Sequence, residues 1–204
     1  MKTANQVTKT VVPVFFSCDN NYLPFLSVAL RSMIDNLNPA TICRVYVLND
    51  GLNGEGVARL NAMQTENVAI EFVDVRPQIA PILEKLNLRD YYTPSIYYRL
   101  FIPTLFPQYS KALYLDADIA VTGDITKLYN TPLGERLVAA VPDAIIESHE
   151  DFRLYAEGGV GVPYRQYFNS GVLVMNLDQF RLQGIRERFT YLLERYHFDT
   201  VCPD

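Results

Sequence analysis

Residues 111–123 read KALYLDADIAVTG, an apolar run that ends in two carboxylates one residue apart. The run predicts a buried strand, and in an extended segment residues two apart point to the same face. Asp116 and Asp118 would then lie side by side, roughly 6–7 Å apart. At an effective dielectric constant of about 20 their repulsion is on the order of 2–3 kcal/mol, so the pair should attract a cation. Carboxylate oxygens favour Mg²⁺, Mn²⁺ or Ca²⁺ over softer metals.

The same D-A-D segment has a plainer interpretation, because aspartate is also a common turn residue. Asp116 would then begin a turn at the strand end, and Asp118 would merely be solvated. The apolar strand that leads to them favours the binding interpretation, since ligands bind at the carboxyl ends of strands in open α/β sheets.

Alternating strand and helix patterns precede this segment. Such alternation implies an α/β fold built on a parallel sheet with right-handed crossovers. Upstream, strands are predicted over residues 11–18, 45–48 and 68–75 and helices over about 24–37 and 55–64. The remaining predicted elements are helices over 83–88, 95–102 and 185–197 and strands over 137–141 and 172–177.

Composition narrows the class of protein. The 204 residues are 49% hydrophobic and 20% charged, which is ordinary for a globular chain. A net charge of −5 without a run of Lys or Arg argues against nucleic-acid binding. The three cysteines form no C-x-x-C pair, which suits a reducing compartment. No segment reaches the ~20 apolar residues of a membrane span, so we expect a soluble, cytoplasmic protein.

One cation, Arg99, lies within the apolar and aromatic segment 95–102. Arginine is rarely buried unless it is paired, so a buried Arg99 would point to a partner. The alternative is that its side chain snorkels from a surface helix.

Four stretches together resemble glycosyltransferase family 8. In chain order they read SCDNNY (residues 17–22), SIYYRLFIP (95–103), DAD (116–118) and YFNSGVLVMNL (167–177). The chain is similar to the bacterial lipopolysaccharide galactosyl- and glucosyltransferases of that family and, more distantly, to glycogenin. The resemblance implies a GT-A type of fold, a nucleotide-binding α/β domain with a mostly parallel sheet whose D-x-D holds a divalent metal, Mn²⁺ or Mg²⁺.

The resemblance runs from about residue 11 to 204 and implies a single domain over residues 1–204. Its nucleotide-binding half would span 11–123. The donor-sugar and acceptor half would span 124–204 and be incomplete at its C-terminal side, where the family has an acceptor-binding region. Membrane association would be at most peripheral and would involve that missing region.

The resemblance also implies roles for single residues in nucleotide binding. Asp19 would accept a hydrogen bond from uracil, with Asn21 nearby and Tyr22 stacked on the base. Arg99 would lie against the diphosphate and the donor sugar, and Asp116 close to the sugar and ribose. An acceptor facing an imide N–H and an aromatic ring on the base face suit uridine.

The metal and sugar contacts are implied in the same way. Asp116 and Asp118 match the metal pair. Asp143 and Asn169 match residues that hold donor-sugar hydroxyls, and Asp204 matches the first Asp of a D-Q-D segment that also reaches the sugar. Plainer roles remain open, because Asp143 and Asn169 are also ordinary turn residues and Tyr22 would also staple the following helix.

The sequence departs from the family pattern at the metal. The family supplies a histidine as a third protein ligand, and neither His149 nor His197 lies in a matching position. With two carboxylates alone metal affinity should fall, although nucleotide phosphates can complete the coordination shell.

The function that these residues imply is metal-dependent, retaining transfer of galactose or glucose from a UDP-sugar to a glycan acceptor in bacterial surface polysaccharide or lipopolysaccharide synthesis. One alternative is a haloacid-dehalogenase-like phosphohydrolase, whose nucleophile motif is also an apolar strand ending in D-x-D. That family places Thr or Val where this chain has Ala120 and carries its motif on the first strand. A second alternative is a fragment that binds the UDP-sugar but does not transfer it.

Overall fold

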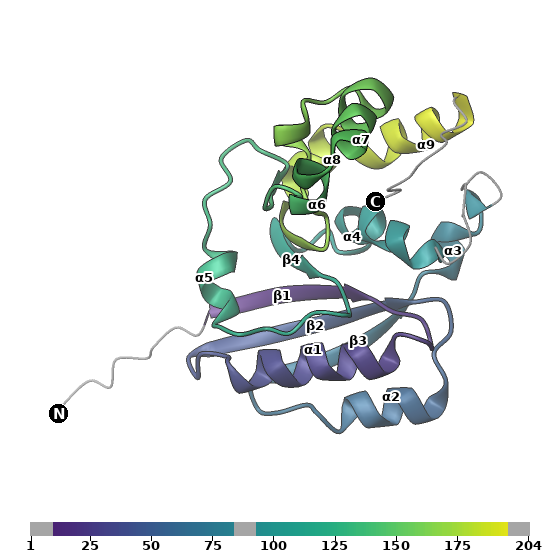
Figure 1. The fold of residues 1–204 in the computed structure, drawn as a ribbon. Helices are drawn as coiled ribbons and strands as arrows, with labels where there is room; N and C mark the ends of the chain where they lie inside the picture. Colours follow the sequence, from purple (N-terminus) through teal and green to yellow (C-terminus); the bar gives the residue numbers. More distant parts are fainter. Residues whose placement is uncertain (1–9, 84–92, 196–204) are drawn as a thin grey trace.

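The computed structural model describes residues 10–83 and 93–195, which are built around a six-stranded sheet (Figure 1). In spatial order the strands run β3-β2-β1-β4-β6-β5. The first four are parallel to one another, and β6 runs antiparallel to both β4 and β5. The strands are β1 (Thr10–Ser17), β2 (Thr41–Asn49), β3 (Val68–Asp74), β4 (Lys111–Leu115), β5 (Val138–Ala139) and β6 (Val172–Asn176).

Helices cover both faces of the sheet, as Figure 1 shows for α1 and α2 on one side and α3 and α4 on the other. The helices of the first half are α1 (Leu23–Asp35), α2 (Gly54–Asn61), α3 (Arg76–Ile79), the 3₁₀ helix η2 (Pro94–Phe101) and α4 (Ile102–Leu105). Those of the second half are α5 (Ile125–Tyr129), α6 (Ala144–Ser148), α7 (Glu150–Leu154), the π-helical η3 (Tyr155–Val160), the 3₁₀ helix η4 (Tyr164–Gln166), α8 (Leu177–Leu182) and α9 (Ile185–Arg195).

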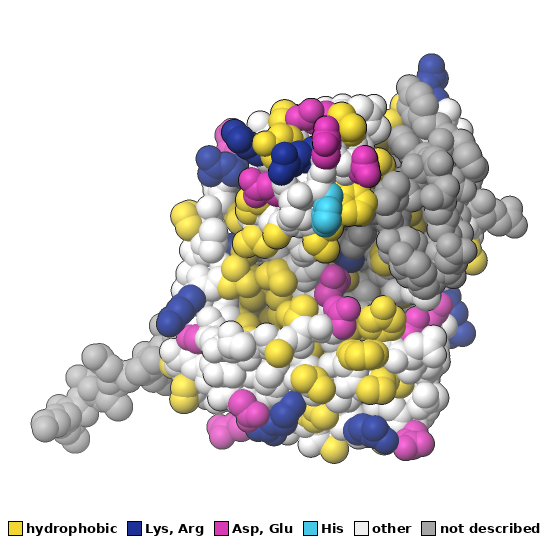
Figure 2. Space-filling view, in the orientation of Figure 1, with side chains coloured by type: hydrophobic (Ala, Val, Ile, Leu, Met, Phe, Trp, Pro, Cys, Tyr) yellow, Lys and Arg dark blue, Asp and Glu magenta, His cyan; other side chains and the backbone are white. Residues whose placement is uncertain are grey.

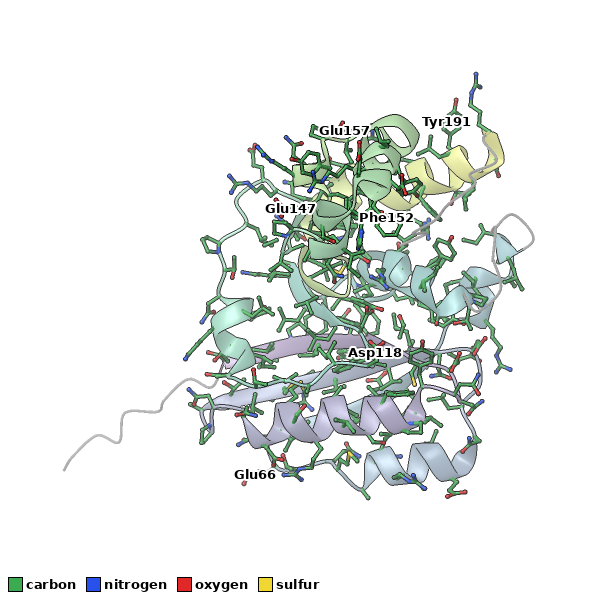
Figure 3. All side chains as sticks on the ribbon, viewed as in Figure 1. Glu66, Asp118, Glu147, Phe152, Glu157 and Tyr191 are labelled. Atoms are coloured by element: carbon green, nitrogen blue, oxygen red, sulfur yellow. The ribbon has the colours of Figure 1, made fainter. Side chains whose placement is uncertain are left out.

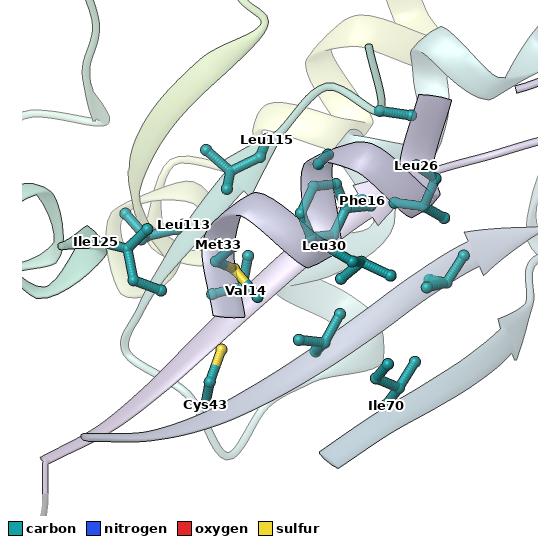
Figure 4. Close-up of a cluster of buried hydrophobic side chains, with 14 of the residues drawn as sticks. Val14, Phe16, Leu26, Leu30, Met33, Cys43, Ile70, Leu113, Leu115 and Ile125 are labelled. Carbon is teal, nitrogen blue, oxygen red and sulfur yellow. The ribbon is translucent and has the colours of Figure 1, made fainter. Parts of the chain in front are cut away.

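Alternation along the strands divides the core into two clusters. On β1, Val14 and Phe16 pack on the side of α1, where Leu30 and Met33 are also fully buried (Figure 4). Phe15 points to the opposite side, into a cluster that includes residues of η2. A strand covered on both faces reads as a continuous apolar run, which is why β1 shows no polar alternation.

The order in which strands are added to the sheet reverses between β1 and β4. From β1 it winds outward through β2 to β3, and it then returns to place β4 on the other side of β1. Both strands are parallel, with Val14 opposite Leu113, so their carboxyl ends open at the same edge. Such a switch point is where open α/β sheets bind ligands.

Several elements differ from the sequence-based expectation. β4 ends at Leu115, so Asp116 and Asp118 lie in the turn that follows and not in the strand. The predicted helix at 95–102 is a 3₁₀ helix followed by α4, whose first turn contains Pro103. The predicted helix at 83–88 falls, apart from its first residue, on residues outside the described range.

No helix within residues 10–83 and 93–195 combines the length and the apolar character that crossing a bilayer requires.

Leu30→Ala should destabilise the fold by about 2–5 kcal/mol, because the truncation leaves a cavity in the α1 cluster. Val28→Ala on the same helix is the matched control, since Val28 is 58% exposed, and it should change the free energy of unfolding by about 0.5 kcal/mol or less. Urea unfolding measures both. Equal effects of the two substitutions would contradict the burial pattern of α1.

Candidate functional site

A cavity of about 250 Å³ opens at the edge where β1 and β4 end. Figure 3 places Asp118 in the middle region of the molecule, and Figure 2 shows acidic side chains in that region of the same face. Four segments line the cavity: the end of β1, the start of α1, the region of η2, and the end of β4 with the turn after it. The lining residues are Ser17, Tyr22, Thr93, Ser95, Ile96, Arg99, Tyr114, Asp116, Ala117 and Asp118.

Arg99 is the buried cation of the cavity, with only 7% of the residue exposed. Its Nε donates to the carbonyl of Ile96 at 2.9 Å, and Nη1 donates to the carbonyl and hydroxyl oxygens of Ser170 at 2.6 and 2.9 Å. Nη2 donates to Asp116 Oδ1 at 3.3 Å. The planar guanidinium therefore joins η2, the end of β4 and the start of β6, which a snorkelling side chain would not do.

Tyr114 forms the floor of the cavity below this ion pair. The residue is 1% exposed, and its hydroxyl donates to Asp116 Oδ1 at 3.1 Å. The guanidinium carbon of Arg99 lies 4.3 Å from the centre of its ring, in cation–π contact. Burial raises the pKa of Tyr114, so the phenol keeps its proton and remains a donor.

Asp116 is held from the other side by the segment before β6. Its backbone N–H donates to the carbonyl of Gly171 at 2.7 Å. A Cβ atom on Gly171 would lie 2.4 Å from Asp116 Oδ2 and 3.1 Å from Asn169 Oδ1. Gly171 therefore allows the Asp116 carboxylate to approach the backbone closely, and it lies between the side chains of Asp116 and Asn169.

Asp143 and Asn169, the two residues expected to hold donor-sugar hydroxyls, lie beside each other. Asn169 Nδ2 donates to Asp143 Oδ2 at 3.3 Å, and its Oδ1 accepts from the N–H of Gly171 at 3.0 Å. Asp143 Oδ1 also accepts from the N–H groups of Ile145 and Ile146 and so caps α6. Both residues thus carry a structural role, and the Asn169–Gly171 contact links them to Asp116.

The predicted base-binding residues follow β1. Asp19 Oδ1 accepts from the N–H groups of Asn21 and Tyr22, at 2.8 and 3.1 Å, and so shapes the turn into α1. Tyr22 lines the cavity and is 43% exposed, with its ring 5.6 Å from that of Phe25. Asp19 and Asn21 are not among the described residues that line the cavity.

The D-A-D turn presents its two carboxylates unequally. Ala117 between them is buried, Asp118 is exposed, and the Asp116 side chain is 32% exposed. The expectation that both would share one strand face is wrong, because the strand ends before them. Both nevertheless line the same cavity, and their hard oxygen donors suit a divalent cation. Within residues 10–83 and 93–195 no group of three or more His, Cys, Asp or Glu side chains forms a metal centre.

The structure thus brings Tyr22, Arg99, Asp116 and Asp118 to one cavity. Asp204 and His197 lie outside the described residues. Sequence reasoning did not single out Tyr114, Ser170 or Gly171. Tyr114 could have been found from the period of two along β4, but the contacts of Ser170 and Gly171 depend on the pairing of β6 with β4.

Asp143→Ala should lower the free energy of unfolding by about 0.5–2 kcal/mol, because α6 loses its N-cap. Asp143→Asn should stay close to wild type, since Asn caps helices as well as Asp does. Thermal unfolding of the two variants separates the capping role from any role in ligand binding. Equal destabilisation by Asn and Ala would contradict the capping role.

Comparison with known proteins identifies the family of the chain. The profile of "Glycosyl transferase family 8" matches residues 13–204. Glycosyltransferase GlyB of Streptococcus pneumoniae is 31% identical over 195 residues, which are 93% of this chain and 41% of that protein. The lipopolysaccharide 1,2-glucosyltransferase of Escherichia coli is 29% identical over 185 residues, 88% of this chain and 52% of that protein.

The same fold is found in the galactosyltransferase LgtC, solved in complex with donor and acceptor sugar analogues. That structure superposes with a TM-score of 0.74 at 28% sequence identity, over 91% of this chain and 65% of LgtC. The α/β architecture is therefore the expected GT-A type. The chain spans about half the length of the curated relatives it matches. On the family profile and these relatives, the chain belongs to glycosyltransferase family 8.

Proposed function

We propose that this chain binds a UDP-hexose, with galactose or glucose as the sugar, and takes part in its transfer to a glycan acceptor of the bacterial surface, such as lipopolysaccharide. The observation that carries the proposal is the convergence of Arg99, Asp116, Asp118 and Tyr22 on one cavity at the β1/β4 switch point. Membership of family 8 supports sugar transfer, and the names of the E. coli and LgtC relatives support a hexose.

The residues of the cavity suit the two ends of such a donor. Tyr22 offers an exposed aromatic face for the uracil ring, and the Asp19 carboxylate lies in the same turn. Asp116 and Asp118 would hold the divalent cation, Mn²⁺ or Mg²⁺. When bound, the cation would offset the negative charge that grows on the leaving diphosphate.

Transfer breaks the bond between the sugar C1 and the diphosphate oxygen, and the bonding electron pair stays with that oxygen. We favour attack of the acceptor hydroxyl on the same face, which forms the new C1–O bond with retained configuration. The proton of the acceptor hydroxyl passes to the departing phosphate oxygen. Arg99 favours this step electrostatically, and Asp143, Asn169 and Asp204 would hold the sugar hydroxyls.

The phosphohydrolase alternative loses its support. The D-A-D follows the fourth strand along the chain, whereas that motif belongs on a first strand. The family 8 match also spans residues 13–204. The second alternative, binding of the UDP-sugar without transfer, stays open, since the chain spans only 41% of GlyB. A UDP-release assay separates binding from transfer, because turnover requires an acceptor site and Mn²⁺-dependent UDP binding does not.

Mn²⁺ should increase the UDP affinity of Asp118→Asn much less than that of wild type, by at least about tenfold less, because the variant loses a charged oxygen ligand of the cation. Glu66→Gln removes one negative charge far from the site (Figure 3) and should leave the gain intact. Isothermal titration with UDP, with and without Mn²⁺, measures both. An undiminished Mn²⁺ gain in Asp118→Asn would exclude this carboxylate as a metal ligand.

Arg99→Lys should reduce UDP-sugar turnover by about tenfold or more, because Lys lacks the planar fork that reaches Ile96, Ser170 and Asp116 together. Arg181→Lys is the matched control. Arg181 also donates to two backbone carbonyls, of Pro103 and Tyr109, but does not line the described cavity. The roles assigned to Arg99 fail if both variants release UDP at the same rate.

A further inference from the structure

We propose that Tyr114 is a positioning residue that fixes the orientation of the Asp116 carboxylate for the nucleotide-bound metal, a role that rests on the proposed function. Tyr114 lies two residues before Asp116, at the end of β4. Its hydroxyl and Arg99 Nη2 both donate to the same oxygen, Asp116 Oδ1, at 3.1 and 3.3 Å. The guanidinium carbon of Arg99 lies over the ring of Tyr114, 4.3 Å from the ring centre. One side chain thus contacts both members of the ion pair.

The second oxygen of the carboxylate lies close to the Gly171 backbone. Asp116 Oδ2 faces Gly171 so closely that a Cβ there would lie 2.4 Å away. Rotation of the carboxylate would therefore have to break two donor contacts at Oδ1 or move Oδ2 along the Gly171 backbone. Asp116 is held in one orientation before any ligand arrives, which lowers the entropic cost of binding.

Packing alone does not explain the Tyr114 hydroxyl. A phenylalanine would fill the same buried volume, and burying a hydroxyl is unfavourable unless it is hydrogen-bonded. Elsewhere in the same cluster the Tyr46 hydroxyl bonds to that of Tyr109 at 2.7 Å, a contact between two structural side chains. The Tyr114 hydroxyl instead bonds to a carboxylate that lines the cavity.

The comparison of Tyr114→Phe with Tyr46→Phe tests the proposal, because each variant removes one hydrogen-bonded hydroxyl from a buried tyrosine, and only the Tyr114 hydroxyl bonds to the Asp116 carboxylate. Urea unfolding without metal should show similar losses of stability. Isothermal titration should show that Tyr114→Phe alone weakens Mn²⁺-dependent UDP binding, by about tenfold, the effect of one hydrogen bond to a charged group. Equal UDP affinities in the two variants would overturn the proposal.

Gly171→Ala approaches the same carboxylate from the opposite side. Its Cβ should displace Asp116 and weaken Mn²⁺-dependent UDP binding, whereas Gly123→Ala, where a Cβ meets nothing within 4 Å, should not. Crystal structures of Tyr114→Phe and Tyr46→Phe test the positioning without a ligand. If wild type shows no Mn²⁺-dependent UDP binding, the proposed function fails. If Asp116 keeps its orientation in Tyr114→Phe, the positioning role fails.

Discussion

The charge of an arginine that is only 7% exposed has to be paired, and the fold around the cavity supplies partners for Arg99. The cation lies between three segments that are far apart in sequence, and each supplies an acceptor: Ile96, Asp116 and Ser170. An uncompensated charge here would be strongly unfavourable, so the positions of these segments are fixed together.

The topology of the sheet explains why these segments meet. The parallel strands β1 and β4 end at one edge, which brings the turn before α1 next to the D-A-D turn. β6 is antiparallel to β4, so its first residues, and not its last, reach that edge. Asn169, Ser170 and Gly171 precede β6 and are therefore available to the site. A parallel sixth strand would have placed them at the opposite edge.

The sequence was sufficient for the strand–helix alternation, the class of fold and most of the residues around the cavity, because these depend on local period and on short motifs. Sequence-based prediction failed where the pairing of distant strands determines the positions of side chains. The end of β4 at Leu115 removed the extended geometry assumed for Asp116 and Asp118. The close approach of Gly171 to Asp116 and the contacts of Ser170 with Arg99 follow from strand register, which no local pattern encodes. Asp143 and Asn169 make the capping and turn contacts that their plainer interpretation as turn residues predicted.

The reversed strand also has a consequence for synthesis on the ribosome. Arg99 and Asp116 leave the exit tunnel well before β6, yet the carbonyl of Gly171 and both oxygens of Ser170 arrive only with the segment that starts that strand. The contacts of Arg99 and Asp116 with this segment can therefore form only after residues 170 and 171 have been synthesised and β6 has paired with β4.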